Sequence, residues 1–251
     1  MLNRRTWSTP GGTLPGLCSD ILKQPHILIA GATGSGKSIL INSLLYALTF
    51  SPPTKYKIIL IDPKRVELRK WRNIPHCIRY ASEPPDMVQA LADAVQLMEN
   101  RYKIMASRDQ DKTTQAHIYI FIDEFADLMT TNKRETLPNL CRLAQLGRAA
   151  GVHLVVATQR PTRDIINGQI KVNLDCRLAL RCPTARDSQN IIERKGAETL
   201  PRYGFGYYLT PDGFDLVKIP LTPPEELRQR VKWWENQTKL KYKLFRLNPG
   251  A

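Results

Sequence analysis

Short apolar runs alternate with amphipathic stretches along most of this chain. The apolar runs are rich in Ile, Leu and Val, which favour strands, and they lie at residues 26–30, 57–62, 77–81, 117–122, 153–158 and 176–181. Between them, apolar side chains recur at the 3.6-residue spacing of core-facing helices over residues 38–50, 86–107 and 134–150. This alternation predicts an α/β fold in which helices cover both faces of a mostly parallel sheet.

The pattern changes toward the C-terminus. Residues 206–210 and 214–219 flank Pro211-Asp212-Gly213, which predicts a β-hairpin. After Pro223-Pro224 the composition shifts to a charged helix that contains Trp233-Trp234. We therefore divide the chain into a lead-in, an α/β core and a basic helical tail, at residues 1–23, 24–222 and 223–251.

Composition narrows the class of protein. Hydrophobic residues make up 42% and aromatic residues 8% of the chain, as in globular proteins. No apolar stretch reaches the roughly 20 residues that span a bilayer, and the start, MLNRRTWSTPGG, lacks the apolar core of a signal peptide. We expect a cytoplasmic protein without a membrane segment. The five cysteines form no CxxC pair and the four histidines are scattered, which favours buried, reduced thiols over a metal site.

The net charge of +14 favours a polyanionic partner. Between residues 228 and 246, seven Lys or Arg residues stand against the single acid Glu235, so this tail carries +6 of that charge. Such a tail is either a contact for nucleic acid or a protein partner, or a solvated helical face. Charge alone does not decide between these.

The most specific motif is GATGSGKS at residues 31–38, directly after the first predicted strand. Its glycines let backbone N–H groups converge on phosphate oxygens, and the helix that follows points its N-terminus at the anion. Lys37 reaches the β and γ phosphates, and the Ser38 hydroxyl is placed to bind Mg²⁺. The residues predicted to bind ATP are Gly31, Ala32, Thr33, Gly34, Ser35, Gly36, Lys37, Ser38 and Ile39.

Two acids end the apolar strand within IYIFIDEFADL at residues 118–128. Because the carboxyl ends of parallel strands meet at the ligand crevice, Asp123 and Glu124 should emerge beside the phosphate loop. Asp123 then suits the Mg²⁺ shell, and Glu124 suits the polarisation of the attacking water. Asp62 and Lys64 end another strand at this edge. They position each other or a phosphate, or they form a local ion pair at a turn.

A polar cluster follows the strand at residues 153–158, in VVATQRPTRD. Thr158 and Gln159 are placed to sense the γ phosphate and to relay its loss to the cations that come next. The competing use of the cluster is structural, with Thr162 capping the following helix. A nucleotide sensor joined directly to a basic loop is what a motor needs.

Two arginines lie on the helix predicted over residues 134–150, in CRLAQLGRAAG. Phosphoryl transfer benefits from an extra cation that stabilises the transition state, often from a neighbouring subunit. Arg148, next to the helix end, is better placed for this than Arg142. The alternative for either residue is a last-turn cation that offsets the helix dipole.

Taken together, HILIAGATGSGKS, IILIDPKRVEL, FIDEFADLM, RLAQLGRAAGVHLVVATQRP, DSQNII and GAETL resemble the FtsK/SpoIIIE family of DNA-pumping ATPases, over about residues 24–213. The resemblance implies a RecA-like P-loop core that assembles as a hexameric ring around double-stranded DNA. It assigns Lys37 and Ser38 to phosphate and Mg²⁺, and Asp123 and Glu124 to metal and catalysis. It assigns Arg148 to an arginine finger that acts in trans.

The resemblance also implies DNA contacts. Arg160 and Lys171 match basic pore-loop positions, which hold the DNA backbone without reading sequence. The second pore loop departs from the family pattern around DSR, because it reads Arg186-Asp187-Ser188-Gln189 here. We expect DNA to be contacted by Arg160, Arg163, Lys171 and Arg186, in a translocase that acts in segregation, conjugative transfer or packaging. The alternative is an ATPase that energises protein secretion, because relatives of this fold move polypeptides.

Overall fold

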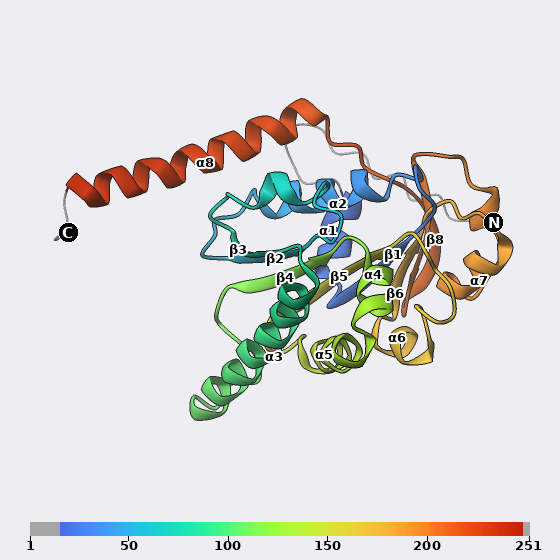
Figure 1. The fold of residues 1–251 in the computed structure, drawn as a ribbon, viewed down its shortest axis with the longest axis horizontal. Coiled ribbons are helices and arrows are strands. Elements are labelled where there is room, and N and C mark those ends of the chain that lie inside the picture. The colour runs from blue at the N-terminus through green and yellow to red at the C-terminus, as the bar shows by residue number, and fades with distance from the viewer. Residues whose placement is uncertain (1–15, 248–251) are drawn as a thin grey trace.

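The computed structural model describes residues 16–247, with the side chains of residues 16–237. Eight strands form one sheet in the order β3-β2-β4-β5-β1-β6-β7-β8 (Figure 1). The parallel strands are β1 (His26–Ala30), β2 (Tyr56–Ile61), β3 (Cys77–Ala81), β4 (His117–Ile122), β5 (Val152–Thr158) and β6 (Cys176–Ala179). The hairpin β7 (Phe205–Thr210) and β8 (Gly213–Lys218) continues the sheet antiparallel to β6.

The sheet has a hydrophobic core on each face, because side chains of a strand alternate between the faces. In β4, Ile118, Ile120 and Ile122 join one core, whereas Tyr119 and Phe121 join the other. Strands buried on both sides read as continuous apolar runs, which is the pattern by which the sequence predicted them.

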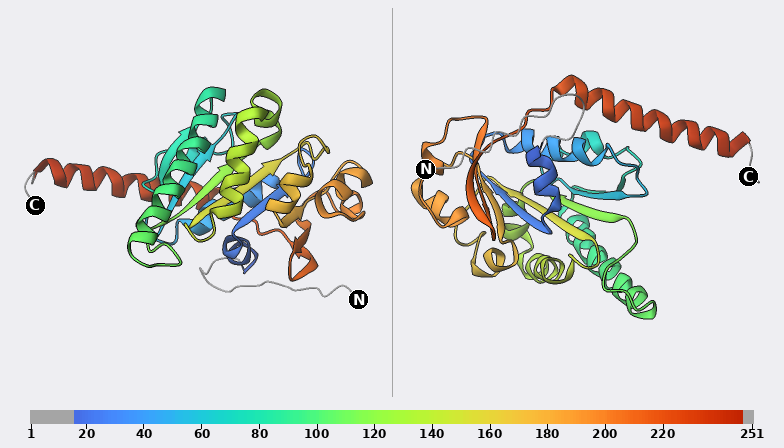
Figure 2. Two further views of the ribbon diagram at one scale, coloured as in Figure 1. Left: turned by 90° about the horizontal axis from the view of Figure 1, so that it is seen from below. Right: turned by 180° about the vertical axis from the view of Figure 1, so that it is seen from behind.

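Helices cover both faces, as Figures 1 and 2 show. One core is closed by α3 (Pro84–Ser107), α4 (Phe125–Thr131), α5 (Lys133–Leu146), α6 (Gly168–Asn173) and α7 (Ala185–Ile192). The other is closed by α1 (Gly16–Lys23), α2 (Lys37–Leu48) and α8 (Pro224–Leu247). Two 3₁₀ turns, η1 (Arg69–Trp71) and η2 (Ala197–Thr199), complete the described elements. The predicted fold class is confirmed.

The predicted strands and hairpin are confirmed to within a residue or two, and the three long helices are also present. The predicted C-terminal end of one helix was wrong. Instead of continuing to residue 150, α5 ends at Leu146, because the Gly147 carbonyl accepts the Val152 N–H across a tight turn at 2.8 Å. The short helices α1, α4 and α7 were missed, since they offer too few turns for a 3.6-residue period to show, whereas the helix expected after Thr162 is present as α6.

The helix α8 begins against α2 and then extends beyond the sheet (Figure 1). Leu227 and Val231 are buried there, and the Trp234 indole donates to the Thr49 carbonyl at 3.1 Å. Arg230 lies over the Phe50 ring, with 4.2 Å between the guanidinium and the ring centre. The tail cations after residue 237 lie outside the described side chains.

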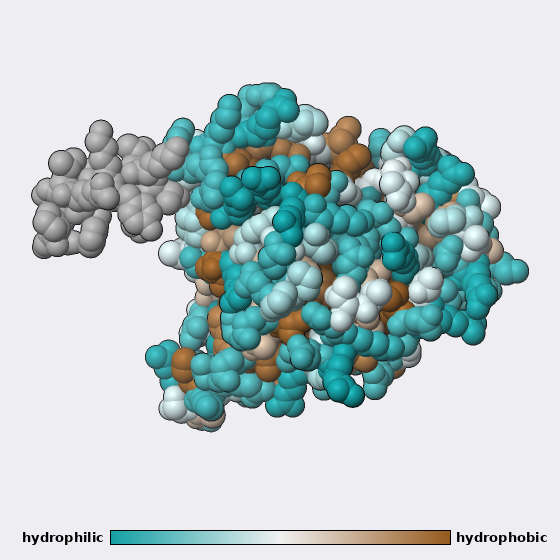
Figure 3. All heavy atoms as spheres, in the orientation of Figure 1, coloured by the Kyte–Doolittle hydropathy of each residue, from teal (hydrophilic) through white to brown (hydrophobic). Residues whose placement is uncertain are grey.

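On the face shown in Figure 3, hydrophobic residues of the described part lie singly or in small groups among hydrophilic ones. None of the described helices is both long enough and apolar enough to cross a bilayer.

Candidate nucleotide-binding site

The phosphate loop connects β1 to α2 at the carboxyl edge of the sheet, where the parallel strands end. Its first residues are fixed by neighbouring strands. The Gly31 N–H donates to the Thr158 carbonyl at 3.3 Å, and the Ala32 N–H donates to the Arg181 carbonyl at 2.9 Å. Gly36 has φ 99°, a conformation that side-chain-bearing residues rarely adopt. The loop therefore presents its backbone at the start of α2, as the motif predicted.

Lys37 contacts the first acid of β4 directly. Its Nζ lies 2.7 Å from Asp123 Oδ1 and 2.7 Å from the Asp123 carbonyl oxygen. Both side chains are almost fully buried, at 3% and 1% exposure. The other carboxylate oxygen, Asp123 Oδ2, is buried without a hydrogen-bond partner among the described residues. An unpartnered buried carboxylate oxygen fits a cation, so the site suits Mg²⁺ held by Asp123 and Ser38.

Glu124 is fixed from three directions. The Thr158 hydroxyl donates to Glu124 Oε1 at 2.7 Å, and the Gln159 N–H donates to the same oxygen at 3.0 Å. Lys64 Nζ lies 3.1 Å from Oε2. These donors fix the position and orientation of the buried carboxylate at the end of β4.

Gln159 links this acid to the phosphate loop. Its backbone contacts Glu124, while its side-chain Oε1 accepts a hydrogen bond from the Thr33 hydroxyl at 2.9 Å. One residue thus touches both the predicted water-activating acid and the loop predicted to hold phosphate. The next residue, Arg160, is exposed.

Two structural alternatives from the sequence are wrong. Asp62 and Lys64 do not form a local ion pair, because Lys64 turns to Glu124, while the Asp62 carboxylate accepts the Leu68 N–H at 3.0 Å. Thr162 does not cap α6 either. The Asn167 side chain does so, since its Oδ1 accepts the Ile170 N–H at 3.0 Å.

Sequence reasoning did not find the residues that line the other side of the phosphate loop. Beside the loop is a hollow of about 330 Å³, lined by residues 32–35 together with Arg181, Cys182, Pro183 and Arg202. A Cβ at Gly34 would lie 3.3 Å from the Arg202 guanidinium. This cation comes from a segment far along the chain, and no spacing rule connects it to the motif.

The four predicted DNA-contacting residues differ in exposure. Arg160, Arg163 and Arg186 are exposed, and their side chains make no hydrogen bond or ion pair among the described residues. Lys171 is only 23% exposed, and its Nζ lies 3.9 Å from Glu193 Oε1. Burial lowers the pKa of Lys171, and the nearby charges of Arg177 and Arg163 lower it further, against the effect of Glu193.

Asn190 joins these basic segments, because its amide donates to the Pro161 carbonyl at 2.9 Å. The loop that carries Arg160 and the helix α7, which begins beside Arg186, are thus in direct contact.

The two finger candidates also differ. Arg142 Nη2 lies 2.9 Å from Glu99 on α3, so this arginine has a partner on the helix surface. Arg148 lies in the turn after α5, is exposed, and makes no side-chain hydrogen bond or ion pair among the described residues. The turn precedes β5, at the opposite edge of the sheet from the phosphate loop. The seven residues of β5 span roughly 20 Å between the two edges.

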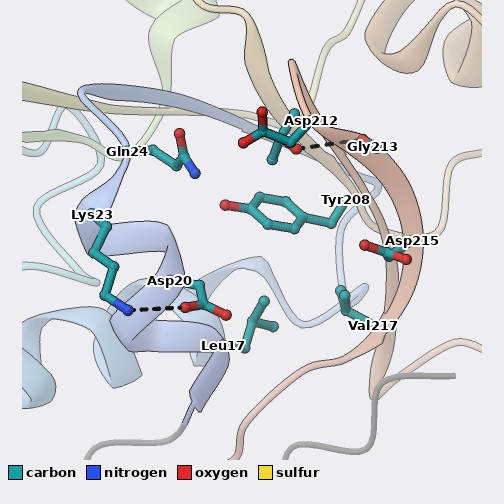
Figure 4. Close-up of a pocket in the computed structure, with 10 residues that line it drawn as sticks. Leu17, Asp20, Lys23, Gln24, Tyr208, Asp212, Gly213, Asp215 and Val217 are labelled. Atoms are coloured by element: carbon teal, nitrogen blue, oxygen red, sulfur yellow. Dashed lines mark hydrogen bonds and ion pairs between the residues drawn. The ribbon is translucent and has the colours of Figure 1, made fainter. Parts of the chain in front are cut away.

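A second hollow lies between α1 and the β7–β8 hairpin, at the same edge as Arg148 (Figure 4). The Tyr208 hydroxyl points toward α1, and the acids Asp20, Asp212 and Asp215 line the space. Lys23 contacts Asp20 at 3.4 Å. Because acids outnumber bases here and the phosphate loop is at the other edge, this hollow does not belong to the nucleotide site.

Comparison with known proteins yields consistent matches. The sequence model of the FtsK/SpoIIIE family matches residues 16–117 and 103–163. A protein named DNA translocase FtsK from Helicobacter pylori (strain J99 / ATCC 700824) is 36% identical over 89% of this chain and 29% of its own length. A namesake from Caldanaerobacter subterraneus is 44% identical over 72% of this chain and 27% of its own length. The chain thus spans under a third of each relative.

The fold also matches solved structures. The pCW3 conjugation coupling protein TcpA, with ATPγS, aligns with a TM-score of 0.74 and 23% identity, over 85% of this chain and 66% of that protein. ATPases 2 and 3 of EssC from Geobacillus thermodenitrificans align with a TM-score of 0.72 and 17% identity, over 87% of this chain and 44% of that one. At these identities the likeness concerns the fold.

Proposed function

Because the chain belongs to the FtsK/SpoIIIE family, we propose that it is an ATP-driven motor that translocates double-stranded DNA. One observation carries this proposal: Glu124, placed to activate water, is hydrogen-bonded to the Gln159 N–H, and the next residue is the exposed Arg160. Hydrolysis and the proposed DNA grip are therefore one peptide unit apart. A movement of Glu124 during hydrolysis would therefore be transmitted directly, through the Gln159 backbone, to Arg160.

In the proposed reaction, the loop residues 31–39 bind the triphosphate of ATP. Lys37 exchanges Asp123 for a phosphate oxygen, and Ser38 and Asp123 hold Mg²⁺, whose charge neutralises the phosphates. Glu124 accepts a proton from the attacking water, and Gln159 senses the γ phosphate through Thr33.

Arg148 completes the proposed reaction from a neighbouring subunit. Its turn is at the opposite edge of the sheet from its own phosphate loop, a separation of roughly 20 Å along β5. An arginine that acts on phosphate from there must serve another copy of the chain, which requires a homo-oligomer. A closed ring of six subunits around DNA is the arrangement we propose.

The proposed DNA contacts are Arg160, Arg163 and Arg186, together with Lys171. The guanidinium groups of the first three have no partner within the described part of the chain and are available to phosphates. Lys171 has to leave Glu193 to do the same. The three arginines, which have no side-chain partner among the described residues, favour DNA over a polypeptide cargo. We place the motor in the cytoplasm, in segregation, conjugative transfer or packaging, with its core in residues 24–222 and the basic tail from 223.

The test is ATP hydrolysis by the full chain with and without long linear double-stranded DNA, at equal nucleotide mass for short and long fragments. We expect DNA to raise the rate of ATP hydrolysis, and long fragments to raise it more than short ones. A motor soon reaches the end of a short fragment and has to bind DNA again before it continues. The Glu124→Gln variant provides the background rate of ATP hydrolysis. Turnover that DNA does not change would contradict the proposal and make a polypeptide cargo the next candidate.

A further inference from the structure

We propose that Arg101 is the positioning residue that holds the Arg148 turn in place for catalysis in the neighbouring subunit. The inference rests on the proposed role of Arg148 as a finger. Arg101 lies within α3, and it is buried, with 5% of its surface exposed. Its side chain contacts the turn between α5 and β5, where Arg148 is located.

The guanidinium binds main-chain carbonyls at the end of the turn. Nη1 donates to the Ala150 carbonyl at 2.6 Å and to the Gly151 carbonyl at 3.4 Å. Nη2 donates to the carbonyl of Ala116, directly before β4, at 2.6 Å. One rigid fork thus ties the turn to the start of two neighbouring strands.

The other carbonyls of the turn also have partners. The Tyr102 hydroxyl, next to Arg101 on α3, donates to the Leu146 carbonyl at 2.7 Å, before the turn begins. The Thr113 N–H donates to the Ala149 carbonyl at 3.0 Å, and the Gly151 N–H closes the turn on the Arg148 carbonyl at 3.3 Å. The backbone on both sides of Arg148 is therefore fixed, while its side chain is exposed.

The turn is tightly packed at both of its glycines. Gly151 has φ 65°, and a Cβ there would lie 2.8 Å from Thr113 Cγ2 and 3.3 Å from Arg101 Nη1. A Cβ on Gly147, at the start of the turn, would lie 2.3 Å from the Val152 carbonyl oxygen. The chain here packs directly against Arg101 and against the first residue of β5.

The chemistry of Arg101 is unusual for a purely structural residue. A buried cation is costly unless it is paired, and Arg101 forms no ion pair with a carboxylate among the described residues. Within the described part of the chain, the groups that compensate its charge are main-chain carbonyl dipoles, and its buried Nε–H has no hydrogen-bond partner there. A neutral side chain would fill the space at lower cost, so what Arg101 adds is the fixed geometry of several charge-assisted hydrogen bonds.

The experiment mixes subunits. In Arg101→Lys, the ammonium replaces the fork and cannot hold the same carbonyls in the same plane. Because misplacement of a catalytic group by about 1 Å costs up to roughly 100-fold in rate, we expect DNA-stimulated kcat to fall about 10- to 100-fold with KM for ATP unchanged. Mixing Arg101→Lys with Glu124→Gln subunits should restore turnover, because the Glu124→Gln neighbour supplies a correctly held Arg148.

Three controls make the result decisive. Arg108→Lys is the same exchange at an exposed position of the same helix region and should leave turnover unchanged. Tyr102→Phe removes a single hydroxyl, is the milder variant if Arg101→Lys does not fold, and should show a smaller loss that mixing also repairs. Arg148→Ala mixed with Glu124→Gln tests the finger itself.

The outcomes separate the two proposals. If Arg148→Ala is rescued by mixing and Arg101→Lys is not, the finger stands and the positioning role of Arg101 is overturned. If Arg148→Ala is not rescued either, the trans finger fails and the inference falls with it. If both Arg101→Lys and Tyr102→Phe keep full turnover, the turn does not need these anchors.

Discussion

The two edges of the sheet are built in opposite ways. At the carboxyl edge, charged side chains contact one another, as in the pairs Lys37–Asp123 and Lys64–Glu124, and two carboxylate oxygens, Asp62 Oδ1 and Asp123 Oδ2, have no partner among the described residues. At the amino edge, main-chain carbonyls are the acceptors, and they are bound by Arg101 and Tyr102. The first edge has contacts that a ligand can replace, whereas the second holds its backbone in one position.

The difference indicates how a ring ATPase divides its work. In the proposed motor, the edge that binds ATP has to change its contacts in every cycle, and its bonds are between movable side chains. The edge proposed to act on the next subunit has to take the same position each time, and its bonds fix the backbone. The predictions that follow test this contrast.

The largest expected effect is at the adjustable edge. Glu124→Gln keeps the shape but removes the charge that polarises water, so turnover should fall roughly 10²- to 10⁴-fold, as expected for a lost general base. ATP binding should be preserved, which a fluorescent nucleotide titration checks beside the steady-state rate. The matched control is Glu135→Gln, at an exposed position of α5, which should leave both unchanged.

Acid should lower the unfolding free energy of the protein through two buried histidines at the amino edge of the sheet. Burial, with a smaller contribution from the nearby His153, lowers the pKa of His26 to about 3. Burial likewise lowers the pKa of His153 to about 4, with His117 and Arg101 adding to the effect against a hydrogen bond to the Pro25 carbonyl. In the unfolded chain both groups bind a proton below about pH 6.5, whereas in the folded chain they stay neutral down to these values. Stability is therefore full above that pH and falls as the pH drops below it.

At pH 5 each of these histidines should cost about 2 kcal/mol of unfolding free energy. Denaturant titrations at pH 7.5 and pH 5 measure the loss, and His153→Gln should reduce it. An unfolding free energy that His153→Gln shifts equally at both pH values would refute the assignment.

A smaller effect is expected from the contact that orients Glu124. Thr158→Val keeps the volume and removes the hydroxyl that donates to Glu124 Oε1 at 2.7 Å. Because this variant loses one charge-assisted hydrogen bond, we expect its kcat to fall roughly tenfold. Thr130→Val is the matched control, because that hydroxyl bonds only to the Ala126 carbonyl within α4. Equal rates for the two variants would show that the other donors suffice.

The smallest effect concerns the exposed cations. Arg160→Ala should weaken DNA binding and reduce the slope of log affinity against log salt by about 1, the value for one lost phosphate contact. Arg108→Ala, at the far end of α3, should leave the slope unchanged. If Arg160→Ala also has no effect on the slope, the phosphate contacts lie elsewhere, and the basic tail becomes the next segment to test.

Much of the nucleotide edge was predictable, because strand ends and helix starts are local features and a parallel sheet brings them together. That rule placed Asp123, Glu124 and Gln159 beside the phosphate loop. It could not show that Lys64 turns to Glu124 rather than to Asp62, since this depends on how the loop after β2 packs. Arg101 was unpredictable for another reason. Arginine inside an amphipathic helix is usually exposed, and only the turn that packs against it explains its burial.

The contact between Lys37 and Asp123 also affects product release. A phosphate that binds Lys37 has to displace a carboxylate held at 2.7 Å, so the protein competes with its own ligand for the same ammonium group. In the proposed reaction, we expect this competition to weaken the binding of ADP and phosphate as well as of ATP. We therefore expect the Asp123 carboxylate to favour product release and to return each subunit of the proposed ring to its starting state.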